Sequence, residues 1–299
     1  MNYQEFLFQV KLQLMKKLGS DHQVTIRSVT KNNNLKLDAL TILEPGRHIA
    51  PTIYLNPYYK EFEQGTMSFE QILSQILAFH REYMPSVPIN PDFFSDFDSV
   101  KDHVAYKLIH YRRNQEVLKT IPHIPYLDLA ICFYCAVQTG PKSQATVLIH
   151  NEHLKMWNID ESTLYETARA NTPKLFPHTL TGMNTFMEQF DDPSLRDLAT
   201  DPSFYLPMYV LSNKYNLFGA SCVLYENLLS QLAVQFNCSY YLLPSSLHEL
   251  ILVPSENKND LAFFSAMVQD VNKSHVAPID ILSDHAYFYD RSQQEIFVK

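Results

Sequence analysis

Glycine is scarce in this chain of 299 residues, and that scarcity constrains the possible folds more than any other feature. The six glycines stand alone, at positions 19, 46, 65, 140, 182 and 219. Nucleotide-binding loops need closely spaced glycines where the backbone approaches a phosphate, as in the patterns GxGxxG and GxxxxGK[ST]. The sequence contains neither pattern. We therefore exclude the common dinucleotide and P-loop folds and expect no cofactor.

The composition is that of a globular protein with an acidic balance. Hydrophobic residues make up 46% of the chain, and 24 Lys and Arg face 32 Asp and Glu, a formal charge of −8. A negative charge argues against general nucleic-acid binding, which depends on neutralising phosphates. The N-terminal residues lack the pattern of a signal peptide, and no apolar run reaches the roughly 18 residues of a membrane helix. The four cysteines form no disulfide framework, so we expect a cytoplasmic chain with reduced thiols and no membrane contact.

Hydrophobic periodicity predicts an α+β fold with mixed, mostly antiparallel sheets and packed helices. Apolar residues spaced by three and four predict helices at 3–18, 69–83, 99–119, 151–156, 160–170, 217–236 and 261–271. Alternating or continuous apolar stretches predict strands at 24–29, 35–43, 53–55, 127–137, 145–149, 208–211, 239–243, 247–253, 286–289 and 295–298. Ser68 and Gln71 have the spacing of a capping box, and Asn56-Pro57 is typical of a helix start.

The domain division is predicted from a proline-rich stretch. Residues 84–98 contain three prolines and three aspartates. We expect an N-terminal α+β subdomain at 1–85, a linker or packed loop at 86–98, and a C-terminal α+β domain at 99–299. We predict no secondary structure for residues 173–206, which are acidic and contain several prolines.

One group of residues resembles a nucleophilic site. Ser246 and His248 are two apart on an extended segment and therefore share a face. A hydrolase would use Ser246 or Ser245 as nucleophile, His248 or His285 as base, and Asp284 or Glu249 to orient the base. The alternative is that Pro244-Ser245-Ser246 and Ser283-Asp284 serve only as turn residues.

Two patterns resemble metal sites but lack ligands. His248-Glu249 begins like HExxH, yet Leu252 occupies the position of the second histidine. Cys132 and Cys135 have CxxC spacing within a buried strand-like run, where their side chains point to opposite faces. We expect no metal site.

A basic stretch gives the chain a second candidate surface. Residues 101–123 contain five Lys or Arg and two acids. On the predicted helix the basic groups do not form one clean stripe, so the first interpretation is a solvated helix face, which could dock on the chain's own acidic loop. The alternative is contact of Lys107, Arg112 and Arg113 with an acidic partner or with nucleic acid. Tyr58 and Tyr59 belong to a large aromatic complement suited to protein interfaces. The first hypothesis is therefore a non-enzymatic interaction or regulatory module with a protein partner, and the hydrolase is the alternative.

Several motifs resemble those of an uncharacterised family of gut clostridial proteins, over nearly the whole chain. They are the stretches at 49–56 (IAPTIYLN) with Tyr58-Tyr59, Asn114 with 121–123, 127–130 (LDLA), 243–249 (LPSSLHE) and 282–285 (LSDH). Residues 145–270 are also similar to the uncharacterised YtpQ-like proteins of bacilli, which supports the α+β class. Neither resemblance implies an activity or a cofactor.

Overall fold

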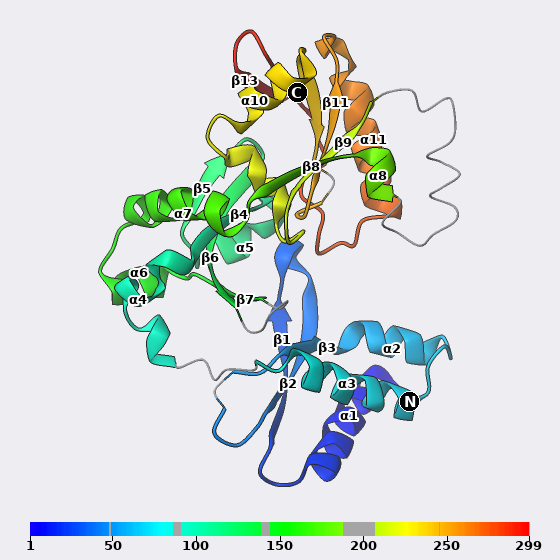
Figure 1. The fold of residues 1–299 in the computed structure, drawn as a ribbon. Helices are drawn as coiled ribbons and strands as arrows, with labels where there is room; N and C mark the ends of the chain where they lie inside the picture. Colours follow the sequence, from blue (N-terminus) through cyan, green and yellow to red (C-terminus); the bar gives the residue numbers. More distant parts are fainter. Residues whose placement is uncertain (48, 86–90, 139–143, 188–206, 245, 299) are drawn as a thin grey trace. The chain divides into compact units, whose positions relative to one another are not determined.

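The computed structural model describes residues 1–47, 49–85, 91–138, 144–187, 207–244 and 246–298, and it confirms the α+β class (Figure 1). Contacts divide the chain into two compact units. The first comprises Met1–Val100 with Ala136–Val147, and the second comprises Lys101–Cys135 with Leu148–Lys299. Of the predicted segment 86–98, residues 86–90 lie outside the described ranges, and η2 (Pro91–Phe94) and α4 (Phe97–Val100) follow them. The predicted division at 86–98 stays a prediction.

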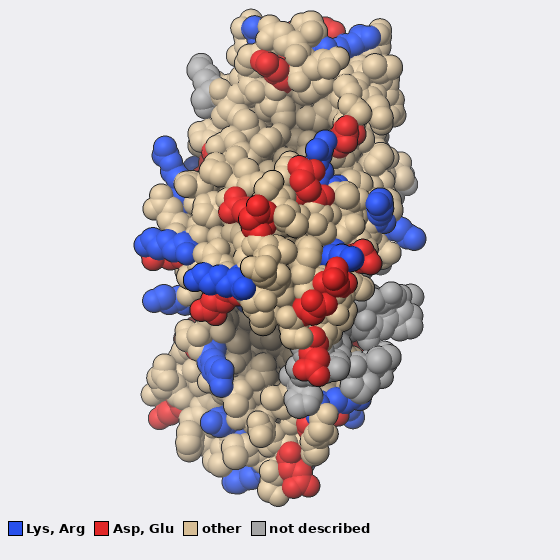
Figure 2. All heavy atoms as spheres, turned by 90° about the vertical axis from the view of Figure 1, so that its left-hand side faces the viewer, with Lys and Arg blue, Asp and Glu red and all other residues tan. Residues whose placement is uncertain are grey.

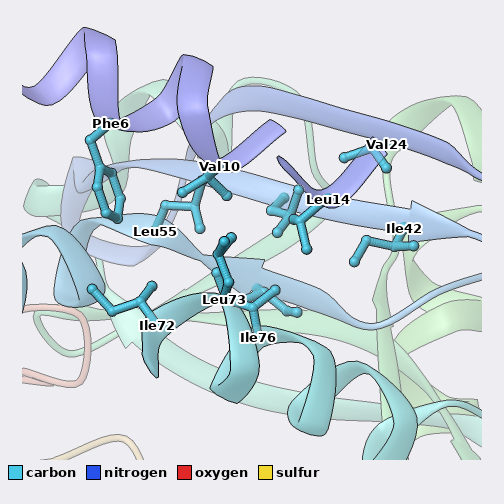
Figure 3. Packing of buried hydrophobic residues seen from close by; sticks show 11 residues of the cluster. Phe6, Val10, Leu14, Val24, Ile42, Leu55, Ile72, Leu73 and Ile76 are labelled. Carbon is cyan, nitrogen blue, oxygen red and sulfur yellow. The ribbon is translucent and has the colours of Figure 1, made fainter. Parts of the chain in front are cut away.

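The first unit packs three helices on one three-stranded antiparallel sheet. The sheet runs β1 (Gln23–Thr30), β2 (Lys36–Leu43), β3 (Thr52–Tyr54), and the helices are α1 (Tyr3–Leu18), α2 (Leu55–Glu63) and α3 (Phe69–Tyr83). Alternate strand residues such as Val24 and Ile42 pair across the sheet and point into the core. Figure 3 shows Phe6, Val10 and Leu14 of α1 in the same cluster as residues of α3.

The helix starts of this unit were predicted in part. The capping box of Ser68 and Gln71 is confirmed, and α1 carries a second one on Asn2 and Glu5. The predicted start at Asn56-Pro57 is wrong by two residues, because α2 begins at Leu55 with Tyr54 as its N-cap. The Asn56 side chain instead accepts a hydrogen bond from the Asp38 backbone N–H at 2.8 Å, so it serves the sheet rather than the helix.

The predicted helix at 99–119 is wrong. Its centre is strand β4 (Val104–His110), which pairs in antiparallel register with β6 (Leu129–Gln138), while β5 (His123–Tyr126) pairs with the other edge of β6. Only α5 (Gln115–Leu118) and short 3-10 turns, among them η4 (Arg112–Asn114), are helical between 101 and 119. Six of the seven β4 residues are buried, as expected for a strand that is covered on both faces. Such a strand is apolar along its whole length, and a short apolar run fits a buried helix equally well, so the sequence pattern could not distinguish the two.

A six-stranded antiparallel sheet forms the larger part of the second unit, in the order β13-β12-β10-β11-β9-β8. One face packs on α11 (Leu261–Ser274) through Phe264 and Val268, and Phe236 of α10 (Leu228–Phe236) contacts Tyr240 in the sheet. The strands are β8 (His178–Gly182), β9 (Tyr209–Asn213), β10 (Tyr240–Leu243), β11 (Leu250–Pro254), β12 (Tyr287–Asp290) and β13 (Glu295–Val298).

The predicted helix at 217–236 is interrupted. Its first part is a 3-10 helix, η5 (Gly219–Leu224), and Asn227 adopts a left-handed conformation (φ 59°) before α10 begins. Asparagine tolerates that conformation because its short polar side chain bonds locally, and Asn227 is the N-cap of α10. The remaining elements are β7 (Gln144–Leu148), which pairs with β6, α6 (Asn151–Trp157), α7 (Glu161–Leu175) and α8 (Met183–Met187).

Candidate functional site

The structure places Ser246 in a turn before β11. Its side chain is buried, at 6% exposure, and its Oγ accepts a hydrogen bond from the His248 backbone N–H at 2.9 Å. The same turn is tied to residues 280 and 281, because Leu247 N–H donates to the Asp280 carbonyl and Ser246 bridges Ile281. The Ser246 hydroxyl therefore has turn geometry, with the backbone of His248 rather than its imidazole as partner. Ser245 lies outside the described residues.

The imidazole of His248 is held on both sides. Its Nδ1 accepts from the Phe218 backbone N–H at 3.4 Å, and its Nε2 lies 3.4 Å from Asp280 Oδ1. The ring also stacks on Phe218, with centroids 5.9 Å apart. The hydrogen bond with Asp280 raises the pKa of His248 above its ordinary value, although burial acts in the opposite direction. The carboxylate beside His248 is thus Asp280, which the sequence analysis did not select, whereas Asp284 or Glu249 was predicted to orient the base.

The His248–Asp280 contact predicts a pH-dependent stability. Because the pKa of His248 is raised in the folded state, the contact stabilises the fold fully below the unfolded value near 6.5 and is lost as pH rises through the folded value. The deficit in unfolding free energy of His248→Gln should therefore be larger at about pH 5.5 than at about pH 8.5, as measured by urea titration. Asp280→Asn should show the same trend, and equal deficits at both pH values would refute the assignment.

Asp284 and His285 lie in a different place, a pocket with a volume of about 570 Å³ that we call the Arg112 pocket. Three segments of the second unit build it: the end of β4 with the following turn, the β5–β6 hairpin, and the residues flanking β12 and β13. Its lining residues are His110, Tyr111, Arg112, Arg113, Pro125, Leu127, Asp128, Asp284, His285 and Val298. The pocket thus unites two residues predicted for catalysis with two predicted for binding.

Asp284 anchors one wall of the Arg112 pocket. Its Oδ2 accepts from the Arg113 guanidinium at 2.5 Å, and its Oδ1 accepts from Asn272 Nδ2 at 3.1 Å. Burial acts to raise the pKa of Asp284, but the hydrogen bonds from Asn272 and Arg113 outweigh it and hold that pKa below its ordinary value. Asp284 is therefore a charged partner of Arg113, and both its oxygens are occupied.

Asp128, which the sequence analysis also did not select, is a second carboxylate in the lining of the pocket. Its two oxygens accept hydrogen bonds from two buried hydroxyls, Tyr287 OH at 2.5 Å and Ser283 Oγ at 2.6 Å. Ser283 Oγ in turn accepts from the His285 backbone N–H at 3.0 Å. The β5–β6 hairpin thereby becomes fixed to the residues before β12.

The two histidines of the pocket differ in exposure. His110 is only 7% exposed, its Nδ1 accepts from the Arg113 backbone N–H at 3.4 Å, and burial lowers the pKa of His110. His285 is half-buried, and its ring has no hydrogen-bond partner among the residues that the structure describes. His110 is thus an uncharged structural group at neutral pH, whereas His285 presents a ring to the pocket.

Three of the predicted binding residues, Lys107, Tyr58 and Tyr59, do not line this pocket. Lys107, on β4, places its Nζ over the Phe218 ring, 4.4 Å from the centroid, as a cation–π contact. Tyr58 and Tyr59 belong to α2 in the first unit, where Tyr59 contacts the rings of Tyr3 and Phe6 and both pack against the core. Arg112 is exposed, and its guanidinium has no partner within the described ranges.

The charges give no broad basic surface on the face drawn in Figure 2, where Lys and Arg are interspersed with Asp and Glu. Among the described residues, no three His, Cys, Asp or Glu side chains are grouped so that they could hold a metal ion. In that same part of the chain, no helix combines the length and the apolar character needed to cross a bilayer. Cys132 and Cys135 are both buried in β6, and burial raises the pKa of each thiol to about 12.

Comparisons with known proteins give one match. Neither the curated proteins nor the solved structures include a match to this chain. A family of unknown function, DUF5688, matches residues 3–291. This agrees with a resemblance to an uncharacterised family over nearly the whole chain, whereas the clostridial origin and the similarity to YtpQ-like proteins stay predictions. The chain belongs to the DUF5688 family.

Proposed function

We propose that the chain is a non-enzymatic interaction module that binds an acidic group of a protein partner in the Arg112 pocket. The observation that carries the proposal is the Arg112 guanidinium, which has no partner among the described residues and lies in a pocket whose two carboxylates are already occupied. An arginine presents five N–H donors in a planar fork that matches a carboxylate. A ligand that satisfies them must bring acceptor oxygens.

The internal contacts of the pocket support an acidic ligand. Asp128 is committed to two hydroxyls, and Asp284 to Arg113 and Asn272. Arg113 offsets the charge of Asp284, and the two hydroxyls occupy the oxygens of Asp128, so Arg112 and the His285 ring are groups of the pocket that can bond to a ligand. Because Arg112 is exposed, its contribution to binding should be screened by salt.

The test is a charge reversal at Arg112. Purified chain is applied to an array of short peptides that vary in acidic residues and in the chemistry of their ends. Arg112→Glu should lower the retention of acidic peptides by tenfold or more, on the order of the 1.5–3 kcal/mol of a hydrogen bond to a charged group. The matched control is Arg27→Glu, which reverses another exposed arginine, on β1 of the first unit, and should leave retention unchanged. If both variants retain the same peptides as the native chain, the proposal fails.

A further inference from the structure

Apolar side chains form part of the Arg112 pocket next to its cationic groups. Leu127 is 44% exposed and Val298 is 38% exposed, and the exposed ring of Pro125 lies two residues before Leu127. Pro125 lies on β5, Leu127 in the β5–β6 turn next to the anchored Asp128, and Val298 at the end of β13. The pocket therefore offers, together, an apolar surface and a guanidinium that no described residue pairs with.

The backbone at Leu127 is strained. Leu127 has a φ of 56°, in the left-handed region, and it is the first of two residues in the turn between β5 and β6. Glycine, which has no Cβ, or asparagine, whose short polar side chain bonds locally, would fit that position better, because Cβ crowds the following carbonyl there. The turn thus displays an exposed leucine at a position that disfavours leucine. Such strain persists where the surrounding structure fixes it, and it points towards a functional use of the side chain.

We infer that the Arg112 pocket binds the C-terminal end of a partner polypeptide, with the terminal carboxylate on Arg112 and an apolar terminal side chain against Leu127, Val298 and Pro125. This inference rests on the proposed function and specifies its ligand. A chain terminus carries a carboxylate and a side chain on the same carbon, so it matches an anion site beside an apolar site. The pocket volume of about 570 Å³ lies within the range of about 300–1,000 Å³ that holds a compact ligand. Capture of a terminal carboxylate is a recurring mode of peptide recognition.

The experiment compares peptide ends at constant sequence. Short labelled peptides ending in Leu, Val or Phe are prepared as free acids and as amides, and a third set carries internal Glu residues with an amidated end. We expect the free acids to bind, amidation to weaken binding on the order of tenfold to a hundredfold, and Arg112→Glu to abolish the difference. Replacing the terminal apolar residue by Ser should weaken binding on the order of tenfold.

The outcomes separate this inference from the proposed function. Equal binding of amidated peptides with internal Glu, still lost in Arg112→Glu, would overturn the C-terminal inference and leave the interaction module standing. Retention of no peptide above the level of Arg112→Glu would overturn both. N-acetyl-leucine competing as strongly as the peptides would make the ligand a small carboxylate and would also overturn the inference.

Leu127→Asn separates a binding role from a structural one. Asparagine relieves the left-handed strain, so this variant should unfold at a higher temperature than the native chain and yet bind the free-acid peptides on the order of tenfold more weakly. A folding defect cannot produce that combination. Met156→Asn, an equally drastic change at an exposed residue of α6, should leave peptide affinity unchanged. Native affinity in Leu127→Asn would overturn the apolar half of the site.

Discussion

Replacing Gly219 by alanine is expected to destabilise the second unit strongly. Gly219 is buried at the start of η5, where the chain crosses β9 and the turn at 246–248. A methyl group there would overlap Ser212 Oγ and the His248 carbonyl oxygen, and it would lie 2.9 Å from the Asn213 backbone nitrogen. Two of these three atoms belong to the backbone, so rotation of a side chain cannot relieve the overlap.

The overlap also breaks an existing bond. Ser212 Oγ donates to the His248 carbonyl at 2.7 Å, and the added methyl group would intrude between them. Overpacking in a core lowers stability by about 1–3 kcal/mol and sometimes more, so we expect a loss of about 3 kcal/mol. For a unit of this size, that corresponds to a fall in Tm of roughly 6–12 °C, measured by circular dichroism.

Gly182→Ala is the matched control. Gly182 ends β8 in the same sheet. Apart from its chain neighbours, no atom of the described residues lies within 4 Å of the position that a methyl group would take, and its backbone φ is not in the left-handed region. Alanine there should leave Tm unchanged or raise it slightly, because alanine restricts the unfolded chain. If the two variants lost the same stability, the close approach at Gly219 would not be the cause.

The second large effect is expected at Asp128. Asp128→Ala removes the acceptor of two buried hydroxyls, since Tyr287 is 2% exposed and Ser283 fully buried. A buried donor left without a partner costs about 1–3 kcal/mol, so the variant should lose about 3 kcal/mol of unfolding free energy. Urea titration followed by circular dichroism measures this loss.

Tyr287→Phe provides the comparison for Asp128→Ala. This variant removes the Tyr287 hydroxyl itself, so no buried donor is left without a partner, and Asp128 keeps its hydrogen bond from Ser283. Tyr287→Phe should therefore lose less unfolding free energy than Asp128→Ala, about 1 kcal/mol. In the double variant, the loss should be less than the sum of the two single losses, because the two side chains share one bond. Strict additivity would contradict the coupling described here.

The candidate site was predictable from the sequence only as separate residues. Arg112, Arg113, Asp284 and His285 were each selected, on the grounds of charge and of similarity to a nucleophilic site. Their association in one pocket depends on contacts such as Arg113 with Asp284, which are 171 positions apart in the sequence. Asp128 was not selected, because the predicted strand at 127–137 included it, whereas the structure places it in the two-residue turn between β5 and β6.

The sequence by itself determined the class of fold and most of its elements. Local signals decided these: the period of apolar residues predicted α1, α3 and most strands, and the Ser68 capping box marked a helix start. The tertiary structure decided the strand identity of 104–110, since pairing with β6 buries a run that also fits a helix. It also decided the partner of His248, because Asp280 reaches that imidazole only after the turn at 246–248 bridges residues 280 and 281. The period of apolar residues reflects only which side of a single segment is buried. An ion pair or a sheet register depends on contact between two segments that are distant in the sequence.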